Sequence, residues 1–427
     1  MEDRITTLRQ ERRKKQIERA RRQRRNAVMA LLCAAVVIAL CAGLIYSLKH
    51  PGEDSPSAEN LTVSSQPETA ETETQETEPV IEPETVITIA ALGDLNVTDK
   101  VIEAGGAGMD FSDLFLDVLP VISRADWTLL NLEGTVGSAP YGGESQTAPA
   151  SLLTALRRAG VDMVQLANSY SIAQGLTGMN NTLQSVRTAG LEPVGLFESS
   201  QEFQKTGGYT LMDIRGVKVA FVAFTKGMDG MGLPAGSEDC VNLLYTDYAS
   251  TYSKIDYDGI SAVMKNVRAG NPDVVIALVH WGSEYNDQIS QSQKDLESYL
   301  RENGANAIIG THSHYVQEMK FDPETGAFTA YCLGDFVGDG SHAGTEYSVV
   351  LELEITKDNR TGQTKITGYD YTPICVVEEA GKLRIRRLSQ ILYAYENSYI
   401  DRVTEEKYQN FVYDKTRVEE RIHPEAE

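Results

Sequence analysis

Short apolar segments alternate with longer amphipathic segments through most of the chain, and this alternation predicts a β-α-β-α order of elements. The apolar segments are rich in Val, Ile and Leu without strict polar alternation, as expected of strands covered on both faces. The predicted strands span residues 86–92, 128–132, 163–167, 217–224, 274–279, 305–309, 330–333 and 349–355. The predicted helices span residues 111–123, 151–159, 176–189, 260–269 and 291–303. This order predicts a layered α/β domain.

Glycines follow four of the predicted helices, at Gly160, Gly190, Gly270 and Gly304. A helix commonly ends where a residue takes the left-handed conformation, which glycine adopts without steric cost. These positions therefore predict the ends of those helices.

The apolar segment at residues 27–48 is too long to be one of these strands. It has 22 residues and no charge, and a helix of that length rises about 33 Å, enough to cross a bilayer core. A cleavable secretory signal has a shorter apolar core of roughly 7 to 15 residues, so we expect an uncleaved transmembrane anchor. Residues 1–26 carry eleven Lys and Arg, which the positive-inside rule places in the cytoplasm. The predicted location is the cell membrane, crossed once, with the main domain extracellular.

The rest of the chain divides by composition. Residues 49–85 are rich in Glu, Thr and Pro and carry no Arg, which predicts a disordered acidic stalk. Residues 86–380 hold the predicted α/β domain. In residues 381–427, apolar positions such as Leu388 and Ile391 recur at helical spacing, which predicts a helical extension. This extension either packs on the domain or docks a protein partner.

Charge narrows the range of partners. The chain has 39 Lys plus Arg against 61 Asp plus Glu, a net charge of −22, and residues 51–427 carry 27 of the basic and 57 of the acidic residues. Nucleic acid is not expected as a partner, because duplex binding depends on Lys and Arg that neutralise phosphates. Residues 1–26 would also suit a nucleic-acid arm or an anionic-lipid patch, although membrane orientation alone explains their charge.

Polar side chains follow six of the predicted strands, where open α/β sheets bind ligands. They are Asp94, Glu133, Asn168, His280, the pair His312 and His314, and Asp335. Carboxylates together with imidazoles are typical ligands of first-row divalent metals. Alternate residues of an extended segment point to the same side, so His312 and His314 either share one ion or bond carboxylates in a polar turn.

At these residues the sequence resembles the CapA family, the poly-gamma-glutamate capsule biosynthesis proteins. The matching stretches are Gly93-Asp94, Asn131-Leu132-Glu133, residues 280–285, residues 310–314 and residues 331–336. The resemblance implies a calcineurin-like metallophosphoesterase fold, an α/β/β/α sandwich, on a membrane anchor. It implies one or two divalent ions (Mn, Zn or Mg) held by Asp94, Glu133, Asn168, His280, His312 and His314. Glu284 either orients His280 or is an ordinary loop acid, and Asp335 either strengthens cation binding or caps a turn.

The chain departs from the family pattern at residues 167–170. Where the family commonly reads Ala-Asn-Asn-His, this sequence reads Ala-Asn-Ser-Tyr. Tyr170 therefore replaces the histidine that would protonate a leaving group, and a phenol with an ordinary pKa near 10 is a poor general acid at pH 7. We expect a partly degenerate metal site, and the sequence leaves open whether any turnover occurs.

These observations predict an extracellular accessory protein of capsule synthesis or export, the capsule being poly-gamma-glutamate or another envelope polymer. The expected partners are the membrane through residues 27–48, a capsule-synthesis membrane complex and the polymer itself. The alternatives are an active metal-dependent phosphoesterase or amide hydrolase with an envelope substrate, and a ligand-binding scaffold with a vestigial site. Because the outer part is acidic, contact with an anionic polymer would need bound cations.

Overall fold

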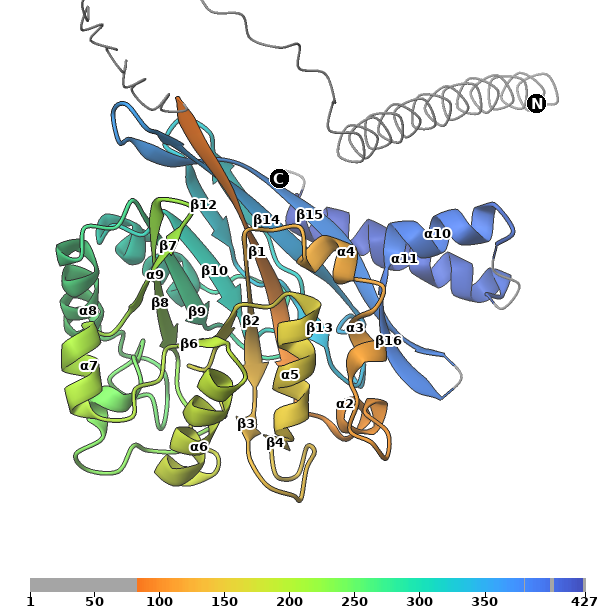
Figure 1. Ribbon diagram of the computed structural model, residues 1–427, viewed down its shortest axis with the longest axis horizontal. Coiled ribbons are helices and arrows are strands. Elements are labelled where there is room, and N and C mark those ends of the chain that lie inside the picture. The colour runs from red at the N-terminus through yellow and green to blue at the C-terminus, as the bar shows by residue number, and fades with distance from the viewer. Residues whose placement is uncertain (1–82, 380, 400–402, 425–427) are drawn as a thin grey trace, which may run out of the picture. The chain divides into compact units, whose positions relative to one another are not determined.

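The computed structural model describes residues 83–379, 381–399 and 403–424 (Figure 1). The predicted cytoplasmic segment, the anchor at residues 27–48 and nearly all of the predicted stalk lie outside these residues. Among the described helices, none has the length and apolar character required to span a bilayer. The predicted anchor therefore stays a prediction.

Two sheets form the centre of the described part. The first has eight strands there, with β13 (Asp335–Val337) beside β1 and the main order β16 (Lys382–Arg387), β15 (Thr364–Glu379), β14 (Tyr347–Asp358), β1 (Glu84–Asn96), β2 (Trp127–Glu133), β5 (Met163–Gln165) and β6 (Glu192–Val194). The second has six strands there, in the order β11 (Met319–Asp322), β12 (Ala327–Ala330), β10 (Ala307–Thr311), β9 (Val274–His280), β8 (Val217–Thr225) and β7 (Thr210–Ile214). A short parallel pair, β3 (Thr135–Val136) and β4 (Thr147–Ala148), follows β2. In the first sheet β1, β2, β5 and β6 run parallel, and in the second β8, β9, β10 and β12 do.

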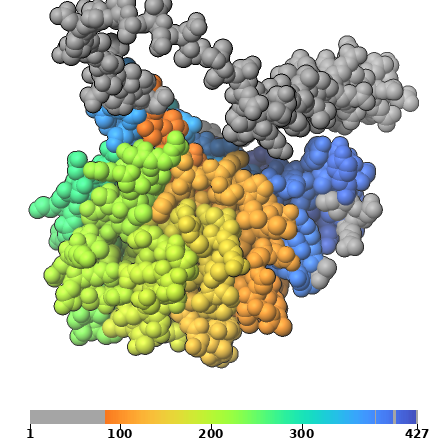
Figure 2. All heavy atoms as spheres, viewed as in Figure 1, coloured from red at the N-terminus to blue at the C-terminus, as the bar shows by residue number. Residues whose placement is uncertain are grey.

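Helices pack around these sheets. They are α2 (Asp99–Ala104), α3 (Ser112–Phe115), α4 (Leu119–Ile122), α5 (Ala150–Ala159), α6 (Gly175–Thr188), α7 (Ser200–Thr206), the 3-10 helix η1 (Glu238–Cys240), α8 (Tyr257–Ala269), α9 (Gln291–Glu302), α10 (Leu388–Glu396) and α11 (Glu405–Ile422). Figure 1 shows α5 and α6 against the first sheet, α8 beside the second, and α10 and α11 behind β14 and β15. In the space-filling view the orange, yellow and green parts of the chain lie directly against one another on this face (Figure 2).

Strand β8 shows how the sequence produces these layers. Its alternate residues Val219, Phe221 and Ala223 belong to the core that the two sheets share, and all are fully buried. The residues between them, such as Val222, belong to a second core with α8 and α9. Because successive side chains of a strand point to opposite faces, an unbroken apolar run suits a strand buried on both sides. Each Val or Phe side chain among them contributes roughly 1.5–3 kcal/mol by leaving water. The predicted α/β class is confirmed.

Three predictions differ from the observed elements by more than a shift of a few residues at one end. The predicted helix 111–123 is two short helices, α3 and α4, because Pro120 lacks an N–H and stands in the first turn of α4. The predicted strand 330–333 is wrong, since β12 ends at Ala330. The boundary predicted at residue 380 falls inside the hairpin of β15 and β16, which pair antiparallel.

Three of the four glycines behave as predicted. Gly160, Gly190 and Gly304 have φ values of 102°, 76° and 102°. Gly270 is an exception, with φ −72°, and Asn271 takes the left-handed conformation instead, at φ 50°.

Candidate functional site

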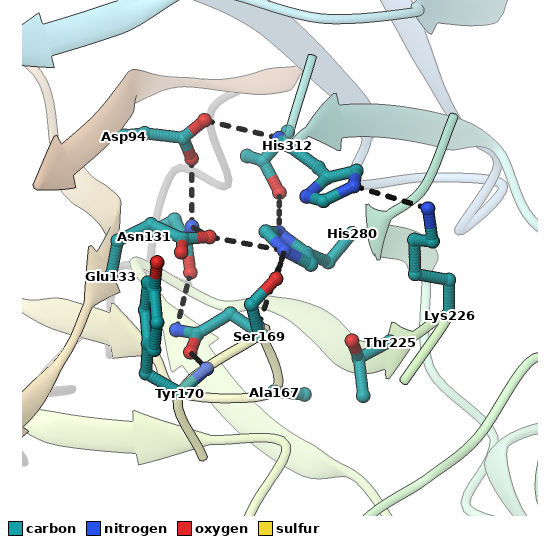
Figure 3. A network of polar contacts seen from close by, with 12 residues as sticks. Asp94, Asn131, Glu133, Ala167, Ser169, Tyr170, Thr225, Lys226, His280 and His312 are labelled. Atoms are coloured by element: carbon teal, nitrogen blue, oxygen red, sulfur yellow. Dashed lines mark hydrogen bonds and ion pairs between the residues drawn. The ribbon is translucent and has the colours of Figure 1, made fainter. Parts of the chain in front are cut away.

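The ends of strands from both sheets meet in one polar cluster (Figure 3). Asp94 is near the end of β1, Glu133 ends β2, His280 ends β9, the loop after β10 carries His312 and His314, and Asp335 begins β13. All six side chains are buried, with exposed fractions from 0% at Asp94 and His280 to 8% at His314. The structure therefore brings together predicted ligands that lie more than 200 residues apart in the chain.

A close backbone crossing fixes Asp94. The pairing of β1 with β2 is irregular between Ala91 and Asp94, and the Asp94 N–H donates to the carbonyl of Gly334 at 3.0 Å. Gly93 lies so near that carbonyl that a Cβ atom at residue 93 would collide with it. Glycine is therefore required there, and the crossing aligns Asp94 with Asp335 across the parallel pair β1 and β13.

The amide of Asn131 bridges two carboxylates. Its Nδ2 donates to Asp94 Oδ1 at 2.7 Å and to Glu133 Oε1 at 3.1 Å, and its Oδ1 accepts from Asn168 Nδ2 at 3.0 Å. The second oxygen of Asp94 accepts the backbone N–H of His312 at 3.0 Å. Burial raises the pKa of Asp94 to about 6, and the nearby Asp335 adds to this rise. Burial together with the nearby Asp94 raises the pKa of Glu133 well above its usual value.

His280 joins the second sheet to the first. Its Nε2 lies 3.0 Å from Glu133 Oε1 and accepts from the backbone N–H of Ser169 at 3.3 Å. Its Nδ1 lies 3.1 Å from Thr311 Oγ1. Burial and the charge of His314 hold the pKa of His280 well below its usual value, so the ring is neutral and suited to metal binding.

The sequence gives Glu284 two possible roles, one of which is to orient His280. In the structure it is Thr311 that contacts His280 Nδ1. Glu284 is exposed on the loop after β9 and lines the cleft near His314 and Tyr285. Thr311 is the last residue of β10 and pairs with His280 of β9, and the order of residues alone does not show that these two strands are neighbours.

His314 and Asp335 form a buried ion pair. His314 Nδ1 lies 2.7 Å from Asp335 Oδ1, as expected of a carboxylate that orients an imidazole. Burial alone would lower the pKa of His314, but the Asp335 carboxylate outweighs it and raises that pKa to about 10. The ring of Tyr285 stacks on His314 with centroids 4.9 Å apart.

His312 faces a lysine that the sequence analysis did not single out. Lys226 follows β8, and its Nζ is 3.2 Å from His312 Nε2. Burial lowers the pKa of His312 well below its usual value, and the neighbouring His280 lowers it further. The rule that pointed to the other strand ends would have found Lys226 too, since it lies one residue beyond the end of β8.

Asn168 and Tyr170 organise the loop after β5. Asn168 Nδ2 also donates to the Leu132 carbonyl at 2.6 Å, and its Oδ1 accepts the backbone N–H of Tyr170 at 3.0 Å. Asn168 therefore has partners on both ends of its amide. Burial and the Glu133 charge raise the pKa of Tyr170 above its usual value, which leaves its hydroxyl protonated at neutral pH.

Two groups of side chains within the described residues could hold a metal ion. One is Asp94, Glu133 and His280, the other is Asp94, His314 and Asp335, and within each group the ligand atoms lie within 4.8 Å of one another. Carboxylate oxygens and imidazole nitrogens suit Mn, Zn and, for the oxygens, Mg. A cation would also offset the cost of burying two carboxylates side by side. The residues therefore fit a divalent ion, with Asp94 common to both groups.

A small cleft leads to these groups. One part, of about 150 Å³, is lined by acids and aromatics that include Glu133, Tyr170, Glu284 and Asp335. A second part, of about 210 Å³, is lined by Ser169, Lys226, Tyr252, Glu284 and His312 among others. A larger cavity of about 650 Å³ lies between β15, β16, α10 and α11 and contains none of the predicted ligands.

Comparison with known proteins gives one family. A family described as bacterial capsule synthesis protein PGA_cap matches residues 88–340. The capsule biosynthesis protein CapA of Bacillus anthracis is 28% identical over 283 residues, covering 64% of this chain and 65% of that protein. The PGA biosynthesis protein CapA of Bacillus subtilis (strain 168) is 27% identical over 319 residues, covering 71% and 78%. The chain thus spans 65% of the length of the Bacillus anthracis relative.

Comparison with solved structures gives matches that share little sequence with this chain. A structure described as a novel phosphatase from Mycoplasma pneumoniae is 14% identical, with a TM-score of 0.43, and covers 68% of this chain and 94% of its own. A hypothetical protein from Thermus thermophilus is 14% identical, with a TM-score of 0.40, and covers 67% and 98%.

Proposed function

The chain belongs to the bacterial capsule synthesis protein family, and from that membership we propose that it is a membrane-anchored, extracellular accessory protein of capsule or envelope polymer synthesis. Both relatives named above are capsule or PGA biosynthesis proteins. A role in capsule synthesis follows from the family. The anchor at residues 27–48, the polymer and a membrane complex as partners belong to the proposal.

One observation supports a metal-dependent role in particular. Asp94 belongs to two groups of buried carboxylates and imidazoles, an arrangement that is costly to bury without a cation. We propose that Asp94, Glu133, His280 and His314 hold a divalent ion, with Asp335 orienting His314. When bound, such an ion polarises an ester or amide oxygen and lowers the pKa of a coordinated water.

The residues around these groups favour an accessory role over efficient turnover. Ser169 and Tyr170 stand where the family commonly has Asn and His. The Tyr170 hydroxyl keeps its proton, because burial raises its pKa, so it can donate a hydrogen bond to a ligand but transfers a proton poorly. The layered sheets and the metal groups suit a metallophosphoesterase-like sandwich whose catalytic step is weakened.

The second candidate is an active metal-dependent phosphoesterase or amide hydrolase of the envelope. The intact pairs of His280 with Glu133 and of His314 with Asp335 favour it. Turnover of a generic phosphodiester by the full-length protein, abolished by His280→Ala, would support this candidate. Turnover that survives the substitution would assign the activity elsewhere.

Metal analysis of the full-length protein in detergent tests the proposed site. After dialysis against Mn²⁺, we expect bound ion that Asp94→Asn and His314→Ala remove. His423→Ala is the matched control, since His423 is exposed at the end of α11. Equal ion content in all four proteins would refute the proposed ligands. For the capsule role, deletion of the gene should reduce surface polymer, and the intact gene should restore it.

A further inference from the structure

The loop after β8 places an ammonium group at the pair of imidazoles His280 and His312. The two rings have their centroids 4.4 Å apart. Lys226 Nζ lies 3.2 Å from His312 Nε2 and 2.8 Å from the carbonyl oxygen of Gly282. It also lies 4.6 Å from the centre of the Tyr252 ring. Figure 3 shows the Lys226 side chain extending toward the His312 ring.

The contacts of Lys226 assign the hydrogen bond. An ammonium has three protons and no lone pair, so Lys226 donates and His312 Nε2 accepts. Both acceptors of Lys226, the Gly282 carbonyl and the His312 ring, are uncharged. The aromatic face of Tyr252 adds a favourable contact for a cation. These three contacts suit an ammonium group.

A metal ion at His312 would need the same lone pair. Imidazole binds a metal through an unprotonated ring nitrogen, so an ion at His312 Nε2 would have to displace the charged Lys226 ammonium that donates to it at 3.2 Å. The fixed charge of the ammonium also repels a divalent ion nearby. Among the described residues, the two groups of side chains whose ligand atoms lie within 4.8 Å of one another do not include His312.

The ligand set at this position is incomplete in another way. Ser169 stands where the family commonly has a second Asn, and its Oγ lies 3.1 Å from His280 Nε2. A serine hydroxyl beside the imidazole pair offers a weaker metal ligand than an amide oxygen in the same place. Ser169, Lys226 and His312 line the same part of the cleft.

We propose that the Lys226 ammonium is a built-in cation beside His312 that keeps a second metal ion from binding through that ring. The exchangeable ion is then held on the Asp94 side alone. This inference rests on the proposed function for the presence of that first ion, but it makes a separate prediction about the number of ions.

The test counts bound ions in variants of the full-length protein. Lys226→Met removes the charge and keeps the length, and Lys226→Arg keeps the charge. Lys218→Met is the control, because Lys218 is exposed at the other end of β8. Each protein is dialysed against Mn²⁺, its metal content is measured by plasma mass spectrometry, and circular dichroism verifies its fold.

We expect Lys226→Met to bind one more ion per chain than the wild type, and His312→Ala in that background to remove the added ion. Lys226→Arg and Lys218→Met should match the wild type. An unchanged ion number in a folded Lys226→Met protein would overturn the inference.

A measurement without the lysine variants gives an independent check. In the wild-type background His312→Ala should leave the ion number unchanged, whereas His314→Ala should lower it. An ion lost on His312→Ala would overturn the inference. The two proposals can fail separately. A wild-type protein that binds no ion would refute the proposed metal site. The ion added in Lys226→Met tests only the position beside His312.

Discussion

The two sheets bring opposite chemistry to the cleft. The first sheet supplies the acids Asp94, Glu133 and Asp335, whereas the second sheet and its loops supply the imidazoles and Lys226. The close pairs cross from one sheet to the other, at 3.0 Å between Glu133 and His280 and at 2.7 Å between Asp335 and His314. In both buried pairs the acid comes from the first sheet and the imidazole from the second sheet or the loop that follows it. The site therefore depends on how the sheets pack, and substitutions on either side of that packing test the dependence.

The largest effect is expected from the core between the sheets. Phe221→Ala creates a cavity in the core that the two sheets share, and Leu300→Ala creates one in the core between the second sheet and α9. Both side chains are fully buried. Each should lower the free energy of unfolding by about 3 kcal/mol. Phe221→Ala alone should also weaken Mn²⁺ binding, because it loosens one sheet against the other. Denaturant unfolding and calorimetric titration measure the two effects, and equal binding losses in both variants would contradict the comparison.

Asp94→Asn should have the next largest effect. Asn keeps the shape of the side chain but removes the charge that both metal-capable groups share. We expect Mn²⁺ affinity to fall by about 100-fold or more, beyond the range typical of residues that merely orient ligands. Asp258→Asn, at an exposed position in the first turn of α8, serves as the control in the titration. An affinity within a factor of about two of the wild type would exclude Asp94 as a ligand.

The pair of His314 and Asp335 predicts a dependence of stability on pH in metal-free protein. The pKa of His314 is raised from 6.5 to about 10, so the folded protein holds this proton more tightly than the unfolded chain. The stabilisation is complete below about pH 6.5 and is lost as the pH rises through 10. The difference in free energy of unfolding between the wild type and Asp335→Asn should shrink by on the order of 2 kcal/mol across that window. Urea unfolding in EDTA at several pH values measures it, and a constant difference would argue against the pair.

Thr311→Val should give the smallest effect. It removes the hydroxyl that contacts His280 Nδ1 at 3.1 Å and leaves the volume nearly unchanged. A lost neutral hydrogen bond costs about 0.5–1.5 kcal/mol, so metal affinity should fall by less than about 10-fold. A loss as large as that of Asp94→Asn would mean that Thr311 is itself a ligand.

The sequence contained enough to predict the parallel strands and the polar residues at their ends. Apolar runs such as residues 217–224 can be recognised because both faces of those strands are buried, and the ends of parallel strands necessarily meet at one edge. Asp94, Glu133, His280 and His314 therefore follow from pattern and position. Their roles as ligands stay predictions until metal is measured.

Other parts of the molecule depend on contacts that no local pattern carries. Much of β15 is half-exposed and mixes Thr, Tyr and Lys, so it lacks the apolar run that marks a buried strand. The contact of Thr311 with His280, and that of Lys226 with His312, join residues 31 and 86 positions apart. Such pairs are set by the packing of the sheets, which the order of residues along one strand does not specify.

The backbone crossing at Gly93 has a consequence for how this protein tolerates change. A side chain at residue 93 would push against the carbonyl of Gly334, and that carbonyl holds Asp94 in place. In a scan of all single substitutions, Gly93 should therefore score like a chemically essential position although it has no functional group of its own. The substitutions that this protein tolerates will therefore depend on the space around its backbone as much as on chemical reactivity, and Gly93 will be among the positions that tolerate the fewest.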